Sequence, residues 1–138
     1  MASAVKYYQF VEDVGRKVHD LNADTLKIAL TNTAPNVSTH AALADITEIS
    51  AGNGYTAGGT AVASNAYSQS AGVGALTGAD VVFTASGGSM ATARYAVLYN
   101  DTSTGDKLIQ YWDYGSSFTL ATGETLTVDF GTNILTIT

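Results

Sequence analysis

Two histidines are the only side chains in this sequence that can serve as imidazole bases. His19 falls at the end of a predicted helix, where a positive charge is favoured, and His40 falls in a polar loop. The sequence contains no cysteine and no Gly-x-Ser-x-Gly motif, which excludes thiol catalysis, thiolate metal sites and the esterase type of serine nucleophile. We therefore predict that the protein is not an enzyme and has no catalytic residue, cofactor or metal.

The Asp and Glu residues do not form a sequence pattern that clearly indicates a metal site or a pair of catalytic carboxylates. The segment 101–106 partly matches a calcium-binding loop but lacks its closing glutamate, so a hairpin turn is the preferred interpretation. Asp113 stands between aromatic residues and has two interpretations, a contact to a sugar or partner and a strand-end residue that faces water. A hydrolase would rest on these acidic residues alone, since glycoside hydrolysis requires only a suitable separation of two carboxylates in space.

Composition excludes several classes of partner. The chain has 138 residues, a net charge of −6 and only 13% charged residues. Six cations are too few for a basic nucleic-acid footprint, and the negative sign opposes binding to anionic lipid. We therefore expect no nucleic-acid partner. We also expect no membrane partner, because the sequence has no long apolar segment and no signal-like N-terminus. The low charge fits either a subunit packed among neighbours or a neutral, threonine-rich β surface.

One amphipathic helix is predicted over about residues 4–19. Its apolar residues recur at helical spacing and form one stripe, consisting of Tyr7, Phe10, Val11, Val14, Val18 and Leu21. A helix this short is marginal in isolation, so we expect it to lie against the body or against a neighbouring subunit.

The remainder, from about residue 25 to 138, predicts short strands. Alternating or continuous apolar residues place about eight strands, at 25–31, 60–68, 79–84, 94–99, 108–114, 118–121, 125–130 and 134–138. The segment 94–99 is apolar on both faces, which predicts a central strand. We expect residues 1–138 to form a single, mainly β domain. Its predicted architecture is a two-sheet, jelly-roll-like β-sandwich with one N-terminal helix.

The glycine-rich segment 52–59 has two interpretations. A phosphate-binding loop would require a following helix, and neither that helix nor a lysine is present. Backbone freedom for a hairpin or for a tight crossing is therefore the preferred interpretation.

Candidate contacts to a partner come from the helix stripe and from the aromatic cluster of one strand. They are Tyr7, Phe10, Val14, Tyr111, Trp112 and Tyr114. The aromatic residues are suited to stacking on sugars or on a partner, although aromatic residues at inward strand positions more often belong to a core.

Four sequence blocks resemble a family of small virion proteins of tailed bacteriophages. The blocks are Asp24–Leu30 followed by Thr-Asn-Thr-Ala-Pro, then Gly52–Gly59, then Ala93–Tyr99, and finally Asp113–Gly115. The resemblance implies a structural component of the particle, namely a capsid decoration or cement protein on the outside of the head. It also implies the major capsid protein as partner, a homo-dimer or homo-trimer, and synthesis in the cytoplasm of the host bacterium. The alternative is a tail or fibre module that binds host-surface glycan.

Overall fold

The structure, a computed structural model, describes residues 3–138. Within this range the chain is mainly β, with several antiparallel sheets and one α-helix. The elements are β1 (Ser3–Lys6), α1 (Tyr8–Gly15), β2 (Leu26–Thr31), the 3₁₀ helix η1 (Leu43–Asp45), β3 (Thr60–Ala61), β4 (Ala66–Ser70), β5 (Val73–Thr77), β6 (Val81–Thr84), β7 (Ala93–Asn100), β8 (Lys107–Phe118), β9 (Thr125–Val128) and β10 (Leu135–Ile137).

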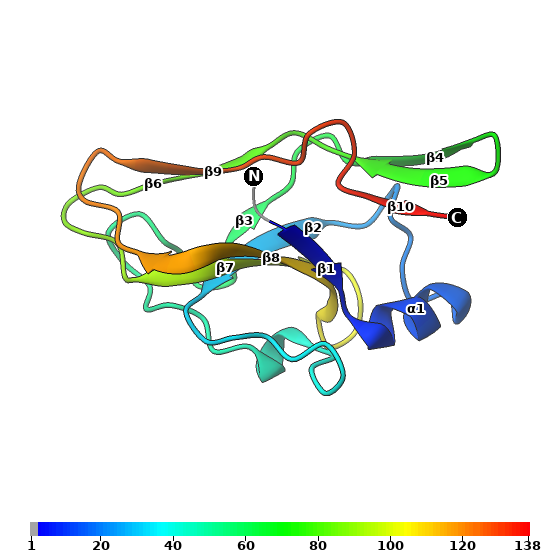
Figure 1. Ribbon diagram of the computed structural model, residues 1–138, viewed down its shortest axis with the longest axis horizontal. Helices are drawn as coiled ribbons and strands as arrows, with labels where there is room; N and C mark the ends of the chain where they lie inside the picture. Colours follow the sequence, from blue (N-terminus) through cyan, green and yellow to red (C-terminus); the bar gives the residue numbers. More distant parts are fainter. Residues whose placement is uncertain (1–2) are drawn as a thin grey trace.

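A five-stranded antiparallel sheet forms the middle of the molecule, with the strand order β1-β8-β7-β2-β3 (Figure 1). Strand β7 lies at its centre and is buried at every position except Arg94, which is half-buried. The prediction of a central strand that is covered on both faces is confirmed. Such a strand needs apolar side chains on both faces, and Val97 and Leu98 supply them on opposite faces.

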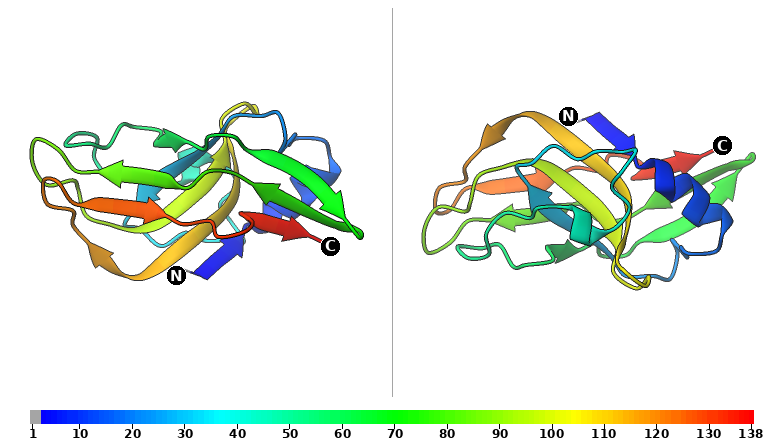
Figure 2. Two further views of the ribbon diagram at one scale, coloured as in Figure 1. Left: turned by 90° about the horizontal axis from the view of Figure 1, so that it is seen from above. Right: turned by 90° about the horizontal axis from the view of Figure 1, so that it is seen from below.

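Two smaller sheets cover one face of the five-stranded sheet. Their strand orders are β10-β5-β4 and β6-β9, and Figure 2 shows them nearly end to end over the crossing strands beneath. Trp112 of the large sheet packs against Phe130, with 5.5 Å between the ring centroids. Buried Gln110 donates a hydrogen bond from Nε2 to the Ile134 carbonyl oxygen at 2.8 Å. The two layers are therefore joined by apolar packing and by a satisfied buried amide.

The opposite face is covered by a long loop, by η1 and by α1, as the view from below in Figure 2 shows. The loop spans residues 32–59, and its Ile46, Ile49 and Tyr55 side chains are buried in the core. The Leu30 backbone amide donates a hydrogen bond to the Tyr55 hydroxyl at 3.1 Å. The loop is thus a fixed covering layer of the sheet.

The helix is shorter than the predicted 4–19, because the chain begins as a strand. Residues of β1 pair with the outer edge of β8, with Val5 opposite Tyr111. The Tyr7 amide then donates to the Ile109 carbonyl oxygen, and α1 begins at Tyr8. The helix ends at Gly15, and Lys17 follows with a φ of 65°. Glycine is a poor helix former, and a positive φ stops helical propagation.

Several predicted strand boundaries also differ. The predicted strand 60–68 is two strands, β3 and β4, because Ser64 adopts a φ of 58° between them. Strand β5 was not predicted, and the predicted strand 118–121 is instead the end of β8 followed by a turn. Residues 3–138 thus contain ten strands where about eight were predicted.

Candidate functional site

His19 belongs to a buried polar network that links the segment after α1 to the end of β7. The side-chain amide of fully buried Asn100 lies 3.0 Å from His19 Nδ1 and donates to Asp24 Oδ2 at 2.7 Å. The side-chain oxygen Oδ1 of Asn100 accepts hydrogen bonds from the backbone amides of Thr102 and Ser103. An amide donor facing Nδ1 favours the neutral imidazole with its proton on Nε2. Burial lowers the pKa of His19, although the Asp13 and Asp24 carboxylates oppose the shift.

The arrangement around His19 is that of a structural network. Within residues 3–138, His19 Nε2 is buried without a hydrogen-bond partner, and His40 instead accepts the Asn36 amide through Nδ1 in a separate turn. No nucleophilic hydroxyl is hydrogen-bonded to either imidazole among the described residues. The described residues also contain no group of three or more His, Asp or Glu suited to a metal ion.

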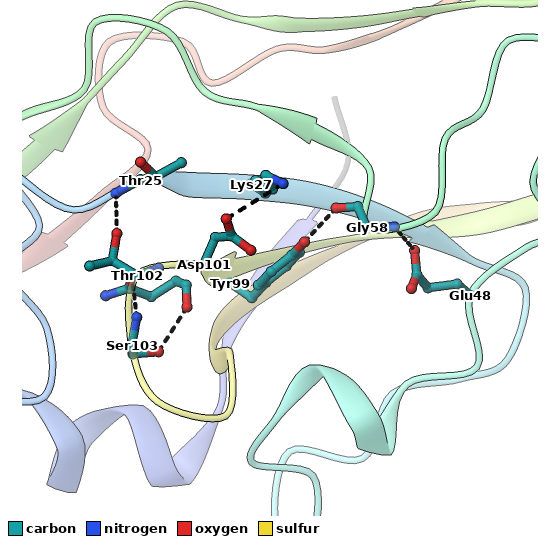
Figure 3. A network of polar contacts seen from close by, with 9 residues as sticks. Thr25, Lys27, Glu48, Gly58, Tyr99, Asp101, Thr102 and Ser103 are labelled. Carbon is teal, nitrogen blue, oxygen red and sulfur yellow. Dashed lines mark hydrogen bonds and ion pairs between the residues drawn. The ribbon is translucent and has the colours of Figure 1, made fainter.

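The segment 101–106 is the hairpin turn that connects β7 to β8. Figure 3 shows the polar contacts that hold this turn, with the Thr25 amide donating to Thr102 Oγ1 at 2.8 Å and Lys27 paired with Asp101 at 3.5 Å. The same network continues to the glycine-rich segment. The Tyr99 hydroxyl donates to the Gly58 carbonyl oxygen, and the Gly58 amide donates to Glu48 Oε1. The structure therefore supports the preferred interpretation of residues 101–106, which was a hairpin turn and not a calcium-binding loop.

The glycine-rich segment 52–59 makes two close crossings, which confirms its preferred interpretation. A Cβ atom on Gly54 would lie 2.1 Å from the Thr84 carbonyl oxygen, and a Cβ atom on Gly59 would lie 1.8 Å from the Ile28 carbonyl oxygen. Both glycines have positive φ angles. The motif therefore allows the covering loop to pass directly over β2 and over the end of β6.

Three of the six predicted contact residues are core residues. Tyr7, Phe10 and Trp112 are 0%, 1% and 5% exposed, so their side chains cannot reach a partner in this conformation. Tyr7 and Phe10 are buried because β1 pairs with β8 and brings the start of α1 onto the core. Of the two positions expected for the helix, the structure has the one against the body, and Tyr7, Phe10 and Trp112 are not accessible to a partner.

The other three predicted residues, Val14, Tyr111 and Tyr114, are half-buried at the margin of the core. Tyr111 packs against Tyr7 at 5.8 Å and against Tyr95 at 6.0 Å between ring centroids. Tyr114 packs against Phe118, and burial raises the pKa of the Tyr114 hydroxyl to about 12. Each of these side chains presents only part of its surface to a partner.

The residues that do expose apolar surface lie in β1 and α1. Val5, Tyr8 and Val11 are 39%, 66% and 69% exposed. Tyr8 and Val11 are three residues apart on one flank of α1, and Val5 lies beside Tyr111 in the register of the sheet. We call Val5, Tyr8 and Val11 the N-terminal surface. Of these three residues, only Val11 was part of the predicted apolar stripe of the helix. Val5 and Tyr8 are apolar residues outside that stripe, and this was the sequence signal for their exposure.

An ion pair lies on strands β7 and β8 beside Tyr111. Arg94 Nε donates to Asp113 Oδ1 at 2.9 Å, and both side chains are 35% exposed. The Arg94 guanidinium lies 5.1 Å from the centroid of the Tyr95 ring. The Arg94 hydrogen bond and the Gly115 amide lower the pKa of the Asp113 carboxyl. Asp113 is thus paired within the chain and also borders an aromatic residue.

An open groove separates the segment after α1 from the sheet of β4, β5 and β10. It has a volume of about 450 Å³, and Val14, His19, Asp24, Tyr67 and Ile137 are among its lining residues. Its walls mix apolar, acidic and amide groups. The groups do not converge on a single point with the geometry of a nucleophile and its base.

No helix among the described residues is both long enough and apolar enough to cross a membrane. Comparisons of the chain with protein-family models, with curated proteins and with solved structures found no match.

Proposed function

We propose that this protein is a structural subunit of a bacteriophage particle that binds the assembled capsid through its N-terminal surface. In this proposal the partner is the major capsid protein, and the protein lies on the exterior of the head. The protein would act as a decoration or cement subunit, with a jelly-roll-like β-sandwich as its body. The sequence blocks that resemble small virion proteins of tailed phages support the proposal.

The observation that carries the proposal is the outward apolar surface of β1 and α1. Val5, Tyr8 and Val11 expose apolar area on adjacent elements, and β1 is the outer strand of the five-stranded sheet. An outer strand offers unpaired backbone groups to a partner, and exposed apolar side chains gain free energy when they are buried. A ligand that binds only the assembled shell stabilises that shell by mass action.

Sedimentation with phage heads that lack this protein tests the proposal. Heads are prepared from a phage in which the gene for this chain has been deleted, and the purified protein is mixed with them. We expect the wild-type protein to sediment with the heads. We expect the variant Tyr8→Ser/Val11→Ser to bind at least about tenfold more weakly, because two exposed apolar side chains contribute on the order of 1.5–3 kcal/mol when fully buried.

The matched control is Ala121→Ser/Thr122→Ser, which changes two exposed residues in the turn after β8. This variant should bind the heads as the wild-type protein does. If the wild-type protein stays in the supernatant, or if both variants bind equally well, the proposal is wrong.

A second candidate function is a tail or fibre module that binds host glycan. The half-buried Tyr111 beside the Arg94–Asp113 pair favours it, because aromatic rings next to polar groups commonly bind sugars. In that case Tyr111→Ala would abolish binding in a glycan assay while Tyr8→Ser would leave it unchanged.

A further inference from the structure

A second open cleft lies between the segment that follows α1 and the turn that connects β7 to β8. Its volume is about 540 Å³, and its lining residues are Lys17, Val18, Thr102, Ser103, Thr104 and Lys107. The two segments are far apart in the sequence, and each contributes one lysine. Among residues 3–138, no Asp or Glu side chain lines the cleft. The cleft is therefore a basic, hydroxyl-rich place on a molecule whose net charge is −6.

Lys17 and Lys107 differ from the other four cations of the chain, because their charges have no partner. Of the other four, three are paired with carboxylates and one donates to a carbonyl oxygen. They are Arg16, Lys27, Arg94 and Lys6. Within residues 3–138, the ammonium groups of Lys17 and Lys107 make neither a hydrogen bond nor an ion pair. The two cations that are left unpaired thus line the same cleft.

The carboxylates in the segments around the cleft do not neutralise these two lysines. Four of them are bound to other groups of the chain. They are Asp20, Asp24, Asp45 and Asp101. Asp106 directly precedes Lys107 in the sequence but does not line the cleft. An anion from solution would therefore displace no internal ion pair when it binds the two ammonium groups.

The end of α1 holds the backbone of Lys17 in an unusual conformation. The Lys17 amide donates to the Val14 carbonyl oxygen, and the Val18 amide donates to the Asp13 carbonyl oxygen. This pair of bonds is the Schellman motif, in which the residue at the place of Lys17 has a positive φ and is usually glycine. Lys17 has a φ of 65°. Because glycine fits this backbone better, a lysine here indicates that its side chain has a use.

The turn between β7 and β8 positions the second lysine. The Lys107 amide donates to Ser103 Oγ at 2.9 Å, which fixes the start of β8. The Lys107 side chain lies over the turn, because a Cβ atom on Gly105 would be 3.9 Å from Lys107 Nζ. The Thr104 hydroxyl, which also lines the cleft, has no hydrogen-bond partner within residues 3–138. The turn therefore offers the cleft one cation and one free hydroxyl donor.

We propose that this cleft binds a phosphate group between the ammonium groups of Lys17 and Lys107. A phosphate group carries up to two negative charges, and its oxygens point in different directions, so it can accept from both sides of the cleft at once. Lysine suits this ligand because its ammonium group is a compact positive charge with three donors. The cleft is separate from the capsid proposal, since none of its lining residues belongs to the N-terminal surface.

Free phosphate and the phosphate group of a larger organic molecule share this chemistry. The cleft adjoins the open groove beside β4, β5 and β10, because Lys17 and Val18 line both. The lining of that groove includes the apolar side chains of Leu21 and Ile137. An organic substituent on the phosphate would therefore find apolar surface next to the two lysines. Inorganic phosphate and phenyl phosphate are the two probes that distinguish these sources.

NMR titration of the isotope-labelled protein tests the phosphate site without any capsid. Sodium phosphate is added at an ionic strength that sodium chloride holds constant, so general screening does not change. We expect saturable shifts confined to the backbone amides of residues 17–18 and 102–107. The dissociation constant should be on the order of 1 mM, because both lysines keep part of their hydration. Tighter binding of phenyl phosphate would assign the site to an organic phosphate, and equal binding would assign it to free phosphate.

Two variants remove the lysines one at a time. Lys17→Gly places glycine at the positive-φ position, so it should be at least as stable in urea as the wild-type protein. It should nevertheless bind phosphate at least about threefold more weakly, and so should Lys107→Gln. The matched control is Arg16→Gln, which makes the same change in net charge at a residue whose guanidinium is paired with Glu12. This control should change the affinity by less than about twofold.

Three results would overturn the phosphate site. The first is the absence of saturable shifts up to about 50 mM phosphate, or shifts spread evenly over the whole chain. The second is wild-type affinity in the folded Lys17→Gly and Lys107→Gln variants. The third is an Arg16→Gln variant that loses as much affinity as they do, because the effect would then come from net charge alone. None of these results bears on sedimentation with phage heads.

Discussion

At Gly59 the covering loop passes so close to β2 that a Cβ atom would lie 1.8 Å from the Ile28 carbonyl oxygen. Gly59 also has a φ of 78°, a conformation that residues with a Cβ atom rarely adopt. Gly15 has neither feature. It is the last residue of α1, its φ is not positive, and a Cβ atom there would meet nothing within 4 Å. Glycine therefore has a different physical role at each of the two positions.

We expect Gly59→Ala to lower the free energy of unfolding by about 3 kcal/mol, because the new methyl group collides with backbone that cannot move away. We expect Gly15→Ala to raise it by about 0.5–1 kcal/mol, because alanine favours the helix. Urea denaturation of both variants measures the two changes. A Gly59→Ala variant as stable as wild type would show that the loop does not cross β2 as closely as described.

The pH dependence of stability should depend on His19. Burial lowers its pKa in the folded state, so the unfolded state binds more protons when the pH falls through the ordinary histidine value of about 6.5. The stability from neutral His19 is therefore complete above about pH 6.5 and is lost as the pH falls below it. Protonated Nδ1 would also face the Asn100 amide, which is a donor.

We expect the urea midpoint of the wild-type protein to fall between about pH 7.5 and 5.5. His19→Gln should remove most of that slope, and His40→Gln should retain it because His40 lies outside the Asn100 network. An equal slope in the wild-type and His19→Gln proteins would contradict the assignment.

Among the elements, α1 belongs to the core on one side and to the surface on the other. Phe10 is 1% exposed and packs 5.3 Å from the His19 ring, whereas Val11 is 69% exposed. Lys6 at the end of β1 donates from Nζ to the Thr136 carbonyl oxygen of β10. The N-terminal segment therefore joins the large sheet to a small sheet, and deletion of residues 1–20 should destabilise the β body itself.

The contrast between neighbouring residues of α1 tests this two-sided role. Phe10→Ala should lower the free energy of unfolding by about 3–5 kcal/mol, because it leaves a cavity in the core. Val11→Ala should change it by less than about 0.5 kcal/mol, because the side chain faces solvent. Thermal or urea denaturation separates the two outcomes. Equal effects would show that α1 does not pack as the structure has it.

The elements that sequence patterns predicted best are those whose own residues determine them. Alternation in Leu26–Thr31 and a two-sided apolar run in Ala93–Asn100 are local signals, and both strands form where predicted. β1 was predicted as helix because its strand state depends on pairing with β8, which is more than a hundred residues away. β5 was missed because Gly74 and Ala75 give it a weak strand signal, and Tyr67 of β4 supplies the packing over Gly74.

The candidate site residues also divide into those that local sequence determines and those that depend on distant parts of the chain. The close crossings of Gly54 and Gly59 were predictable, because a glycine-rich motif without a lysine or a following helix has few other uses. The burial of Tyr7, Phe10 and Trp112 could not be decided from their residue types, since an aromatic side chain can pack on a core, which is the commoner case, or on a partner. Only the position of β1 beside β8 decides between these possibilities for Tyr7 and Phe10.

For the whole molecule, the distribution of charge and apolar surface matters more to the proposed capsid role than any one cleft. Charged residues occur in α1, in turns and loops and on several strands of the large sheet, whereas the run from Ile49 to Ala79 contains none. The exposed apolar residues of the N-terminal surface lie outside that uncharged run, in β1 and α1. In the proposed role many copies would bind one shell, and linked weak contacts bind far more strongly than single ones.

The proposed role is that of a phage head protein, and cryo-electron microscopy of the particle to which the chain would belong tests it most directly. We predict many copies of the molecule on the outside of the head, each with Val5, Tyr8 and Val11 turned toward the capsid. Purified particles that contain no copy of this chain on the head would contradict the account.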